Sequence, residues 1–485
     1  MKPKIIVKIC LFFFLLLGFF TIYNQIFRIK MDEGDSLKIF YEQKKDTVDV
    51  LALGSSHVFG SINPAVLYRD YGIACYDLCG AGSPTKVSYY YLKEAVKTQT
   101  PKVIILGVGD STYLDGNIDA GIEMSYLWTG NMKLSKNKID MVREIAYEKW
   151  FEVLLGYPIT HGRYDGDLEE RDFLPYRGDK YHEYYKGNRV FWGTKEEEYN
   201  VSDFPYTSEV GELPYDTQKW IDGVLKIGND ISAEVILYAP PALRTREEQM
   251  TINAIGEYAK KRNIVFLDLN SKRDLLEIDF ESEMNDKAHV NYLGQEKTSR
   301  FVGEYLINNY TLPDRRGDGN YDSWRLCEED YETAYNARVL SLQEGTLSKY
   351  LEYISDKDYT ILVIIRNVEN SHDLLSDEQD SLQTIGIASD MINDNSEFLI
   401  CKGKIQSFEF GENRTFGGHS ILIDENRLQY DLHSIGFPDN HLTFIVFDNK
   451  QESIIEYRYY LYDNTKDEWV LQREDCGMQD IWNKR

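Results

Sequence analysis

The sequence predicts an α/β fold, a doubly wound parallel sheet, over residues 47 to 310, because strand-like and helix-like segments alternate there. The strand-like runs, such as "TVDVLALG", "GIACYDLCG" and "PKVIILGVG", are continuously apolar and do not alternate with polar residues. That pattern is typical of parallel strands whose two faces are both covered.

Helical segments separate these strands. "PTKVSYYYLKEAVKTQ" follows the second strand-like run, and Pro84 suits the first turn of a helix. The alternation resumes after residue 214 with the segments "YDTQKWIDGVLKI", "AEVILYAPP", "REEQMTINAIGEYAKKRN", "IVFLDLN" and "YLGQEKTSRFVGEYLINNY". The second and fourth of these are expected to be strands of the same sheet.

A large insertion, residues 110 to 214, interrupts the alternation and is rich in Tyr and Trp. It follows the carboxyl end of a strand, where open α/β sheets bind their ligands, so one interpretation is a cap that shapes the substrate site. The other interpretation is a helical excursion packed around its own aromatic core. The sequence leaves both open.

A second domain of α+β character is expected over residues 346 to 485, after the polar boundary "TLPDRRGDGNYDSW". "YTILVIIRN" and "HLTFIVFDN" predict strands, and "LSDEQDSLQTIGI" predicts a helix capped by Ser376. "HSILIDENRLQYDL" predicts a hairpin with "DENR" as its turn.

The first 30 residues predict a transmembrane helix. Three lysines precede an apolar run from Ile9 to Tyr23, near the roughly 20 residues that a membrane helix needs, and no small-x-small cleavage site follows. We therefore predict an uncleaved signal anchor in the cell membrane, with the N-terminus cytoplasmic and the domains that follow extracellular. A cleaved signal peptide is the alternative, which also places the chain from about residue 31 outside.

Composition excludes some classes of function. A net charge of −26 disfavours a nucleic-acid partner, which would need a basic face. The six cysteines are too sparse for a disulfide framework. No CxxC or HExxH pair is present, so we predict no metal and no cofactor.

The stretch "LALGSSHVFG" places Ser56 directly after the first predicted strand. A serine hydroxyl becomes a nucleophile when a base removes its proton, and a histidine base needs a carboxylate to fix its tautomer. "NDKAHVNYLG", after the last predicted strand, contains Asp286 and His289, whose spacing in one helical turn puts both side chains on the same side. Both motifs are expected at the carboxyl edge of the sheet, which would bring the three residues together.

Each of these signals has an ordinary structural interpretation when it is taken alone. Ser56 also suits the N-cap of a helix, and Asp-x-x-His is common in surface turns. The placement of the two motifs on the first and last strands of one α/β unit is what favours a catalytic set.

At these motifs the chain resembles the SGNH (GDSL-like) hydrolase family, which implies a flavodoxin-like sheet over residues 47 to 310. "GSSH" matches the family's first motif and "DKAH" its last, so the resemblance assigns the nucleophile to Ser56, the base to His289 and its carboxylate to Asp286. It also implies an oxyanion hole formed by the backbone N–H groups of Ser56 and of Gly80 in "LCGAGS".

The family's third motif, Gly-x-Asn-Asp, is not intact. The chain has "LGVGDSTY" after the third strand, with Gly109 where asparagine is expected, which removes one oxyanion donor. Two polar neighbours are weaker candidates for substrate binding. His57 is expected to be a structural or substrate-contact residue and not the base, and Asp110 is expected to be a strand-end cap.

The Gly-Ser-Ser variant is more like membrane-anchored members of the family, such as D-alanyl-lipoteichoic acid biosynthesis and alginate O-acetylation proteins. The resemblance implies a surface-anchored serine esterase or O-acyltransferase for small acyl groups, such as acetyl, on cell-wall or capsular polysaccharide. A transferase would need a multipass membrane acyl donor protein as its partner. The alternative, which the departure at Gly109 favours, is a catalytically degenerate fold that serves glycan binding or assembly.

The C-terminal region, residues 346 to 470, resembles the interleukin-like EMT inducer (ILEI) domain in the order of its strand-like segments, from "YTILVIIRN" to "HLTFIVFDN". That resemblance implies carbohydrate binding. A packing or spacer domain is the alternative interpretation.

Overall fold

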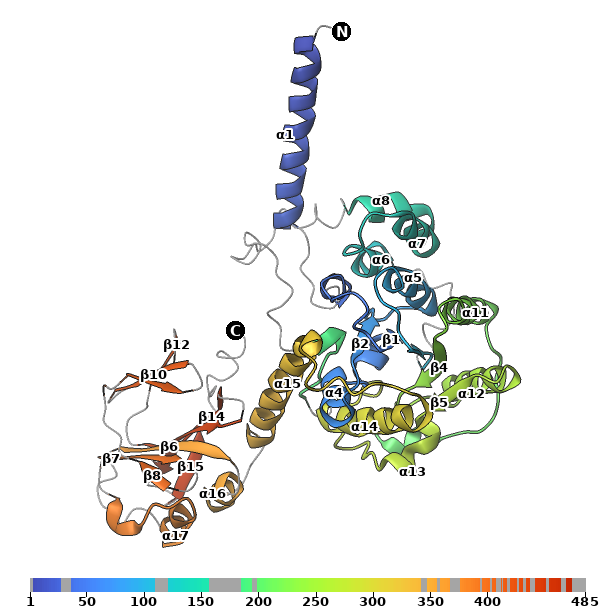
Figure 1. Cartoon of the computed structure of the whole chain (residues 1–485). Helices are drawn as coiled ribbons and strands as arrows, with labels where there is room; N and C mark the ends of the chain where they lie inside the picture. The colour runs from blue at the N-terminus through green and yellow to red at the C-terminus, as the bar shows by residue number, and fades with distance from the viewer. Residues whose placement is uncertain are drawn as a thin grey trace. The chain divides into compact units, whose positions relative to one another are not determined.

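The chain divides into two compact units, Met1–Glu328 and Glu329–Arg485. The computed structural model (Figure 1) describes residues 3–27, 36–109, 121–156, 185–193, 199–341, 347–355, 358–366, 376–392, 395–401, 404–406, 411, 413–416, 419–424, 427–430, 433–436, 441–450, 453–463 and 468–472. The predicted α/β range, 47 to 310, lies in the first unit, and the predicted α+β range, 346 to 485, lies in the second.

The first unit contains the predicted parallel sheet, whose five strands have the order β2-β1-β3-β4-β5. Val50 of β1, which lies between β2 and β3, pairs with Cys75 on one side and Val103 on the other. This order is the one that flavodoxin-like doubly wound sheets have. The strands are β1 (Val50–Gly54), β2 (Cys75–Cys79), β3 (Val103–Gly107), β4 (Glu234–Ala239) and β5 (Val265–Asp268).

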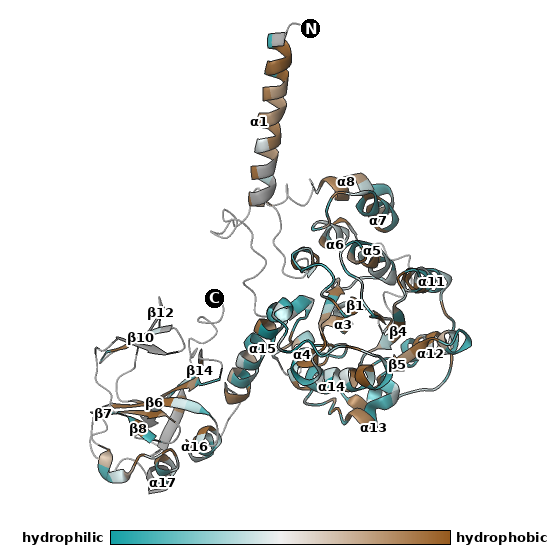
Figure 2. Ribbon diagram, viewed as in Figure 1, coloured by the Kyte–Doolittle hydropathy of each residue, from teal (hydrophilic) through white to brown (hydrophobic). Residues whose placement is uncertain are grey.

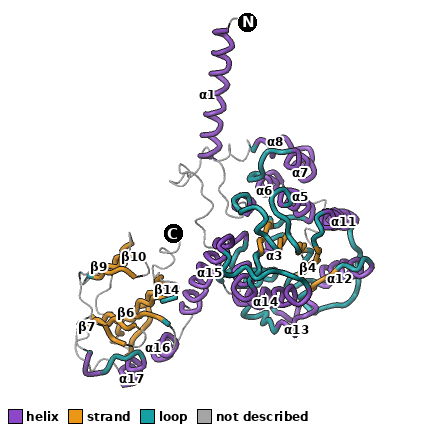
Figure 3. Tube along the Cα trace, in the orientation of Figure 1, coloured by secondary structure: helices purple, strands orange, loops and turns teal. Residues whose placement is uncertain are grey.

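Helices cover both faces of this sheet (Figure 3). They are α2 (Ser36–Phe40), α3 (Ser56–Phe59), α4 (Pro64–Tyr71), α5 (Thr85–Ala95), α11 (Tyr215–Asp230), α12 (Arg246–Lys261), α13 (Arg273–Leu276) and α14 (Tyr292–Asn309). Leu51 and Leu53 of β1 join a core with residues of α5, α11 and α12. Val50 and Ala52 join the opposite core with residues of α3, α4 and α14. The continuously apolar strand is therefore explained by burial of both its faces.

The N-terminal segment forms α1 (Pro3–Phe27), which is coloured as hydrophobic along most of its length in Figure 2. Lys4 and Lys8 lie within this helix. Among the helices that the structure describes, none has the combination of length and apolar character that crossing a membrane requires. The predicted signal anchor has no support from this finding.

The described part of the insertion is mostly helical, with α6 (Gly121–Thr129), α7 (Lys136–Ala146) and α8 (Trp150–Leu155), and short 3-10 turns at Tyr147–Lys149, Tyr185–Gly187 and Val201–Asp203. Trp128, Met141 and Val153 are buried in the same core as α5. This part is a packed helical excursion, which was one of the two interpretations of the sequence. Residues 110–120, 157–184 and 194–198 of the insertion lie outside the described residues.

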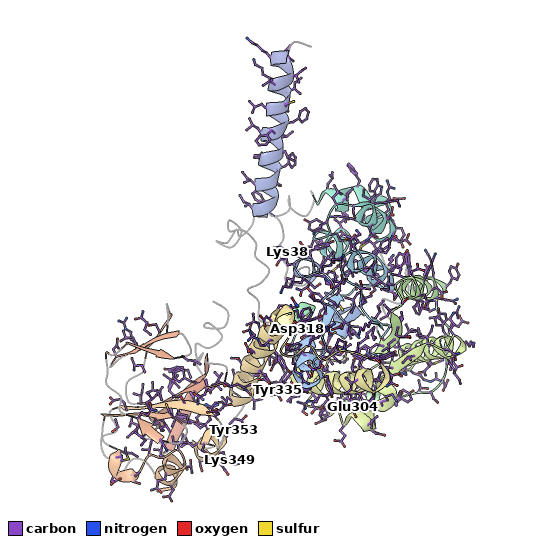
Figure 4. All side chains as sticks on the ribbon, viewed as in Figure 1. Lys38, Glu304, Asp318, Tyr335, Lys349 and Tyr353 are labelled. Atoms are coloured by element: carbon purple, nitrogen blue, oxygen red, sulfur yellow. The ribbon has the colours of Figure 1, made fainter. Side chains whose placement is uncertain are left out.

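The first unit continues past the predicted end at residue 310. Arg315 donates to the Asp49 carboxylate, with Nε 2.7 Å from Oδ2, and Trp324 Nε1 donates to the Cys75 carbonyl over 2.8 Å. Trp324 belongs to α15 (Asp322–Ser341), which follows the 3-10 turn Gly319–Tyr321. Figure 4 labels Glu304 on α14, Asp318 before that turn and Tyr335 on α15. The stretch "TLPDRRGDGNYDSW" is polar because it lies on the surface, yet its charged and aromatic side chains bind it to the first unit.

The second unit has the predicted α+β character, with antiparallel sheets. A six-stranded sheet has the order β15-β14-β13-β6-β7-β8, and a four-stranded sheet has the order β12-β11-β10-β9. Ile423 pairs with Leu428, as expected for the predicted hairpin. The elements are α16 (Leu347–Ser355), β6 (Tyr359–Arg366), α17 (Ser376–Thr384), β7 (Asn395–Cys401), β8 (Lys404–Gln406), β9 (Asn413–Phe416), β10 (His419–Ile423), β11 (Arg427–Tyr430), β12 (His433–Gly436), β13 (His441–Asp448), β14 (Ser453–Asp463) and β15 (Glu468–Gln472).

A buried ion pair lies in the core of the second unit. Arg458 is 2% exposed and Glu456 is 5% exposed, and Arg458 Nε donates to Glu456 Oε1 over 3.0 Å. The guanidinium also donates to the Leu340 carbonyl and lies 4.1 Å from the centre of the Tyr350 ring. Burial raises the pKa of Glu456 to about 7, although the charge of Arg458 and its hydrogen bond act in the opposite direction.

We expect this carboxyl to make the stability of the second unit depend on pH. Its pKa is about 7 in the folded unit and 4.5 ordinarily, so the stability it contributes is full below about pH 4.5 and is lost as the pH rises through 7. The variant Glu456→Gln should flatten this part of the profile, measured by hydrogen exchange of β6, β13 and β14. Glu352→Gln, an exposed position on α16, should leave the slope unchanged. An equal slope in Glu456→Gln and the parent would contradict the prediction.

Candidate active site

Ser56 lies at the carboxyl edge of the sheet because α3 packs closely on the ends of β1 and β3. β1 ends at Gly54 and α3 begins at Ser56. A Cβ atom on Gly54 would lie 2.4 Å from Val58 Cγ2, and one on Gly107, at the end of β3, would lie 2.1 Å from the same atom. Glycine at both strand ends therefore allows Val58 to pack onto the strands and places α3 directly over them.

Ser55, and not Ser56, caps this short helix. The backbone N–H of His57 donates to Ser55 Oγ over 3.4 Å, so the capping role belongs to the first serine of "GSSH". Ser56 is the first residue of α3. This arrangement removes the alternative interpretation of Ser56 as the helix cap and leaves its hydroxyl for a contact outside the helix.

That contact is with His289. The Ser56 hydroxyl lies 2.8 Å from His289 Nε2. The other ring nitrogen, Nδ1, lies 2.9 Å from both oxygens of the Asp286 carboxylate. A carboxylate only accepts, so Nδ1 carries the proton and Nε2 accepts from Ser56. The structure thus brings together the three residues that the two motifs predict.

Asp286 and His289 lie on a turn and not on the helical turn that their spacing suggested. The Asp286 Oδ1 atom accepts from the backbone N–H groups of Ala288, over 2.7 Å, and of His289, over 2.9 Å. An antiparallel β-bridge between Met284 and Val290 joins the two ends of the loop that contains Asp286 and His289. The aspartate therefore shapes the loop that holds its own histidine, which is a common property of Asp in turns.

Electrostatics keep the Asp286 carboxylate charged. Its partial burial would raise its pKa, but the hydrogen bond and charge of His289, the N–H of Ala288 and the amide of Asn285 lower the pKa to about 2. A carboxylate that stays ionised can orient the imidazole and stabilise its protonated form.

The His289 ring lies between two other rings. The centre of the His57 ring is 4.9 Å away, and that of Phe191 is 5.0 Å away. Burial lowers the pKa of His57 well below its ordinary value, and the electrostatic influence of His289 and Arg244 acts in the same direction, while that of Asp286 opposes it, so His57 is neutral. His57 makes an edge contact with the base, and Ser56 takes the position at Nε2.

Phe191 belongs to the insertion, so a piece of the insertion does reach the site. Its backbone carbonyl accepts from Tyr292 N–H over 2.9 Å, at the start of α14. Three residues earlier, the Asn188 amide donates to the carbonyls of Phe59, over 2.5 Å, and of Ile62, over 2.6 Å, at the end of α3. Sequence reasoning missed both residues, because the only signal was the aromatic richness of the whole insertion.

A small pocket lies beside Ser56, between the ends of β1 and β3 and the first turn of α5. Its lining consists of glycines and small or polar side chains: Gly54, Ser55, His57, Val58, Ser83, Thr85, Ser88, Gly107, Val108 and Gly109. His57 and Gly109, two of the positions that the sequence singled out, line this pocket. Asp110, the other candidate for substrate contact, lies outside the described residues.

Gly80 does not have the geometry that its expected role requires. Its backbone N–H donates to the Gly54 carbonyl over 3.0 Å, which extends the β2–β1 ladder by one bond. Ser83 Oγ donates to the same carbonyl over 3.0 Å. The Gly80 N–H is therefore engaged within the sheet edge, which corrects its expected assignment as an oxyanion donor.

In the ranges that the structure describes, no group of three or more His, Cys, Asp or Glu residues could hold a metal ion.

The contact between Ser56 and His289 predicts selective chemical reactivity. A fluorophosphonate probe should label Ser56, because its hydroxyl lies at hydrogen-bond distance from the His289 imidazole. Labelling should disappear in Ser56→Ala and persist in Ser55→Ala, which loses a helix cap worth about 1 kcal/mol but not the base. Peptide mapping of the labelled chain by mass spectrometry measures this, and a label on Ser55 would contradict the assignment.

Comparison with known proteins finds no family model that matches the chain and no curated protein with significant similarity. The likeness to SGNH hydrolases and to the ILEI domain thus remains an expectation based on the motif residues.

Proposed function

We propose that the chain is a serine esterase or O-acyltransferase of SGNH type, which acts on acetyl groups of cell-wall or capsular polysaccharide. One observation carries this proposal. The Ser56 hydroxyl lies 2.8 Å from His289 Nε2, and His289 Nδ1 lies 2.9 Å from the Asp286 carboxylate. This is the arrangement that nucleophilic acyl transfer requires.

The reaction follows from these contacts. Ser56 Oγ attacks the ester carbonyl carbon while its proton passes to His289 Nε2, and Asp286 stabilises the resulting imidazolium. The alcohol then leaves with that proton, and the acetyl group stays on Ser56 Oγ. Water or a sugar hydroxyl then gives its proton to His289 and attacks the acyl carbon. The bond from that carbon to Ser56 Oγ breaks, Oγ takes the proton back from His289, and acetate or a new ester is released.

The pocket supports a small acyl group. Its wall is formed by Ser55, Ser83, Thr85 and the glycines at the ends of β1 and β3, close to the nucleophile. A long acyl chain gains affinity from a long apolar channel, which a lining of glycines and hydroxyls does not provide.

The substrate class, partner and location rest on the sequence. The proposal places the enzyme on the outer side of the cell membrane, held there by residues 1 to 30 as a signal anchor. In the transferase form it receives acyl groups from a multipass membrane protein. The second unit binds carbohydrate in this proposal, in line with its likeness to the ILEI domain.

A second candidate function is glycan binding or assembly by a degenerate fold. The specific observation in its favour is that two expected oxyanion donors are changed, since Gly109 replaces an asparagine and the Gly80 N–H is engaged by Gly54. A protein of this kind would bind sugars without forming a covalent adduct.

The test uses the full-length chain, with Ser56→Ala as the control, and p-nitrophenyl acetate as the substrate. Release of p-nitrophenol and an acetyl adduct in the intact mass, both absent in Ser56→Ala, are the expected results. No turnover and no adduct in a folded chain that the fluorophosphonate also fails to label would reject catalysis, and a glycan array would then test the second candidate.

Replacement of Asp286 should show how much the rate depends on the orientation of the His289 imidazole. Asp286→Asn is expected to lower kcat by about 10⁴-fold, because the amide favours the wrong imidazole tautomer. Since the pKa of Asp286 is about 2, the acid limb of kcat/KM is not due to protonation of this carboxylate. Kinetics of p-nitrophenyl acetate hydrolysis against pH measure both effects.

The control for this variant is Asp274→Asn, an exposed aspartate on α13, which should retain the parent kcat. A kcat for Asp286→Asn within tenfold of the parent would contradict the assigned role.

A further inference from the structure

The space beside Gly109, where the family's asparagine would stand, is already filled. A Cβ atom on Gly109 would lie 2.6 Å from Pro240 Cδ, 3.0 Å from Arg244 Nη2 and 3.1 Å from Ala239 Cα. A side chain at residue 109 would therefore require Pro240 or Arg244 to move. The glycine is not a simple loss of a side chain, because another residue occupies the place.

Arg244 is the residue that holds this region together. Its side chain is 4% exposed, Nε donates to the Gly109 carbonyl over 3.1 Å, and Nη2 donates to the Pro240 carbonyl over 2.8 Å. One rigid guanidinium thus binds the chain after β3 to the chain after β4. This fixes the backbone of Gly109 at the edge of the sheet.

The backbone of the Arg244 segment is also joined to the loop of the proposed base. Leu243 N–H donates over 2.7 Å to the carbonyl of Lys287, which lies between Asp286 and His289. Ala242 exchanges two hydrogen bonds with the Asn270 side chain, of 3.0 and 2.8 Å. The segment of Leu243 and Arg244 therefore links Gly109 to the loop that carries Asp286 and His289.

Gly109 lines the pocket and is held at its carbonyl by Arg244. Its carbonyl and its Cβ direction both face Arg244 and Pro240, while the residue also lines the pocket with Ser55 and His57. In the part of the chain that the structure describes, no backbone carbonyl accepts a hydrogen bond from the Gly109 N–H. Its neighbour Val108, in contrast, donates to the Tyr238 carbonyl over 2.8 Å.

We propose that Arg244 is a positioning residue that holds Gly109 so that its backbone N–H, with that of Ser56, binds the oxyanion in place of the missing asparagine amide. This inference rests on the proposed function. When Ser56 Oγ bonds to the carbonyl carbon, the π electrons move to the carbonyl oxygen, and the two N–H groups stabilise that charge. The pair returns to form the carbonyl when the leaving oxygen departs with the proton from His289. The buried charge of Arg244 adds to the stabilisation, because attraction is strong where water is excluded.

The experiment compares Arg244→Met and Arg244→Lys with the parent, all full length. For p-nitrophenyl acetate we expect Arg244→Met to lower kcat by about 10²-fold, with KM changed by less than about threefold. The inhibition constant of methylboronic acid, which forms a tetrahedral adduct with serine, should rise by about the same factor as kcat falls. Arg244→Lys, which keeps the charge and one donor, should recover part of the loss.

Two further variants sharpen the comparison. Arg246→Met changes an exposed arginine two residues away, and its kinetics should equal those of the parent. Gly109→Asn restores the family's residue, yet we expect it to lower kcat, because its Cβ would lie 2.6 Å from Pro240 Cδ.

The outcomes separate this inference from the proposed function. Fluorophosphonate labelling of Ser56 with parental kcat and boronate affinity in Arg244→Met would overturn the role of Arg244 and leave the catalytic proposal standing. A loss of labelling together with a large fall in Tm, in both Arg244→Met and Arg244→Lys, would also overturn it in favour of a merely structural role. A folded parent chain that neither turns over the ester nor labels at Ser56 would reject both.

Discussion

The packing of Val58 against two glycines is the constraint on which the rest of the site depends. Because Gly54 and Gly107 have no side chains, α3 approaches β1 and β3 closely enough for the Val58 methyl to occupy the space above them. This position puts Ser56 just after β1, an inner strand, at the edge where the carboxyl ends of five parallel strands lie. A methyl group on either glycine would lift α3 and with it the serine, at a cost that includes the overpacking of Val58.

The other end of α3 is held by polar contacts that also reach the helix after His289. Asn188 donates to the carbonyls of Phe59 and Ile62, and Gln295 of α14 donates to Phe59 over 3.3 Å. The Asn63 amide donates to Gln295 Oε1 over 3.0 Å. These buried amides donate to backbone carbonyls that have no partner within the short helix. Each such carbonyl, if buried without a donor, would lower the stability by about 1 to 3 kcal/mol. They also fix α3 relative to α14, so that the serine and the histidine are positioned by one network.

Much of this could be predicted from local sequence. The five strands, their parallel arrangement and the meeting of Ser56 with Asp286 and His289 follow from apolar runs and from the geometry of parallel sheets. The roles of Gly80 and Gly109 differ from those expected, because the residue type in a motif does not determine the direction of its backbone N–H. Gly80 bonds to Gly54, and Gly109 faces Arg244, a residue 135 positions away. Phe191 and Asn188 also depend on long-range packing, and no periodicity marks them.

The polar groups around Ser56 favour catalysis over binding on physical grounds. Sugar binding uses exposed aromatic faces and hydrogen-bond partners, and it gains nothing from a carboxylate with a pKa of about 2 joined through an imidazole to a serine. Burial of the Arg244 guanidinium carries a desolvation cost of several kcal/mol, against which the carbonyls of Gly109 and Pro240 act as acceptors. Such a cost is understandable where negative charge develops during a reaction, because fixed donors and charges then stabilise the transition state more than the ground state. Under the proposed function, the segment around Gly109 would be a rearranged oxyanion site, in which a buried cation and a backbone N–H take the place of a neutral side-chain amide.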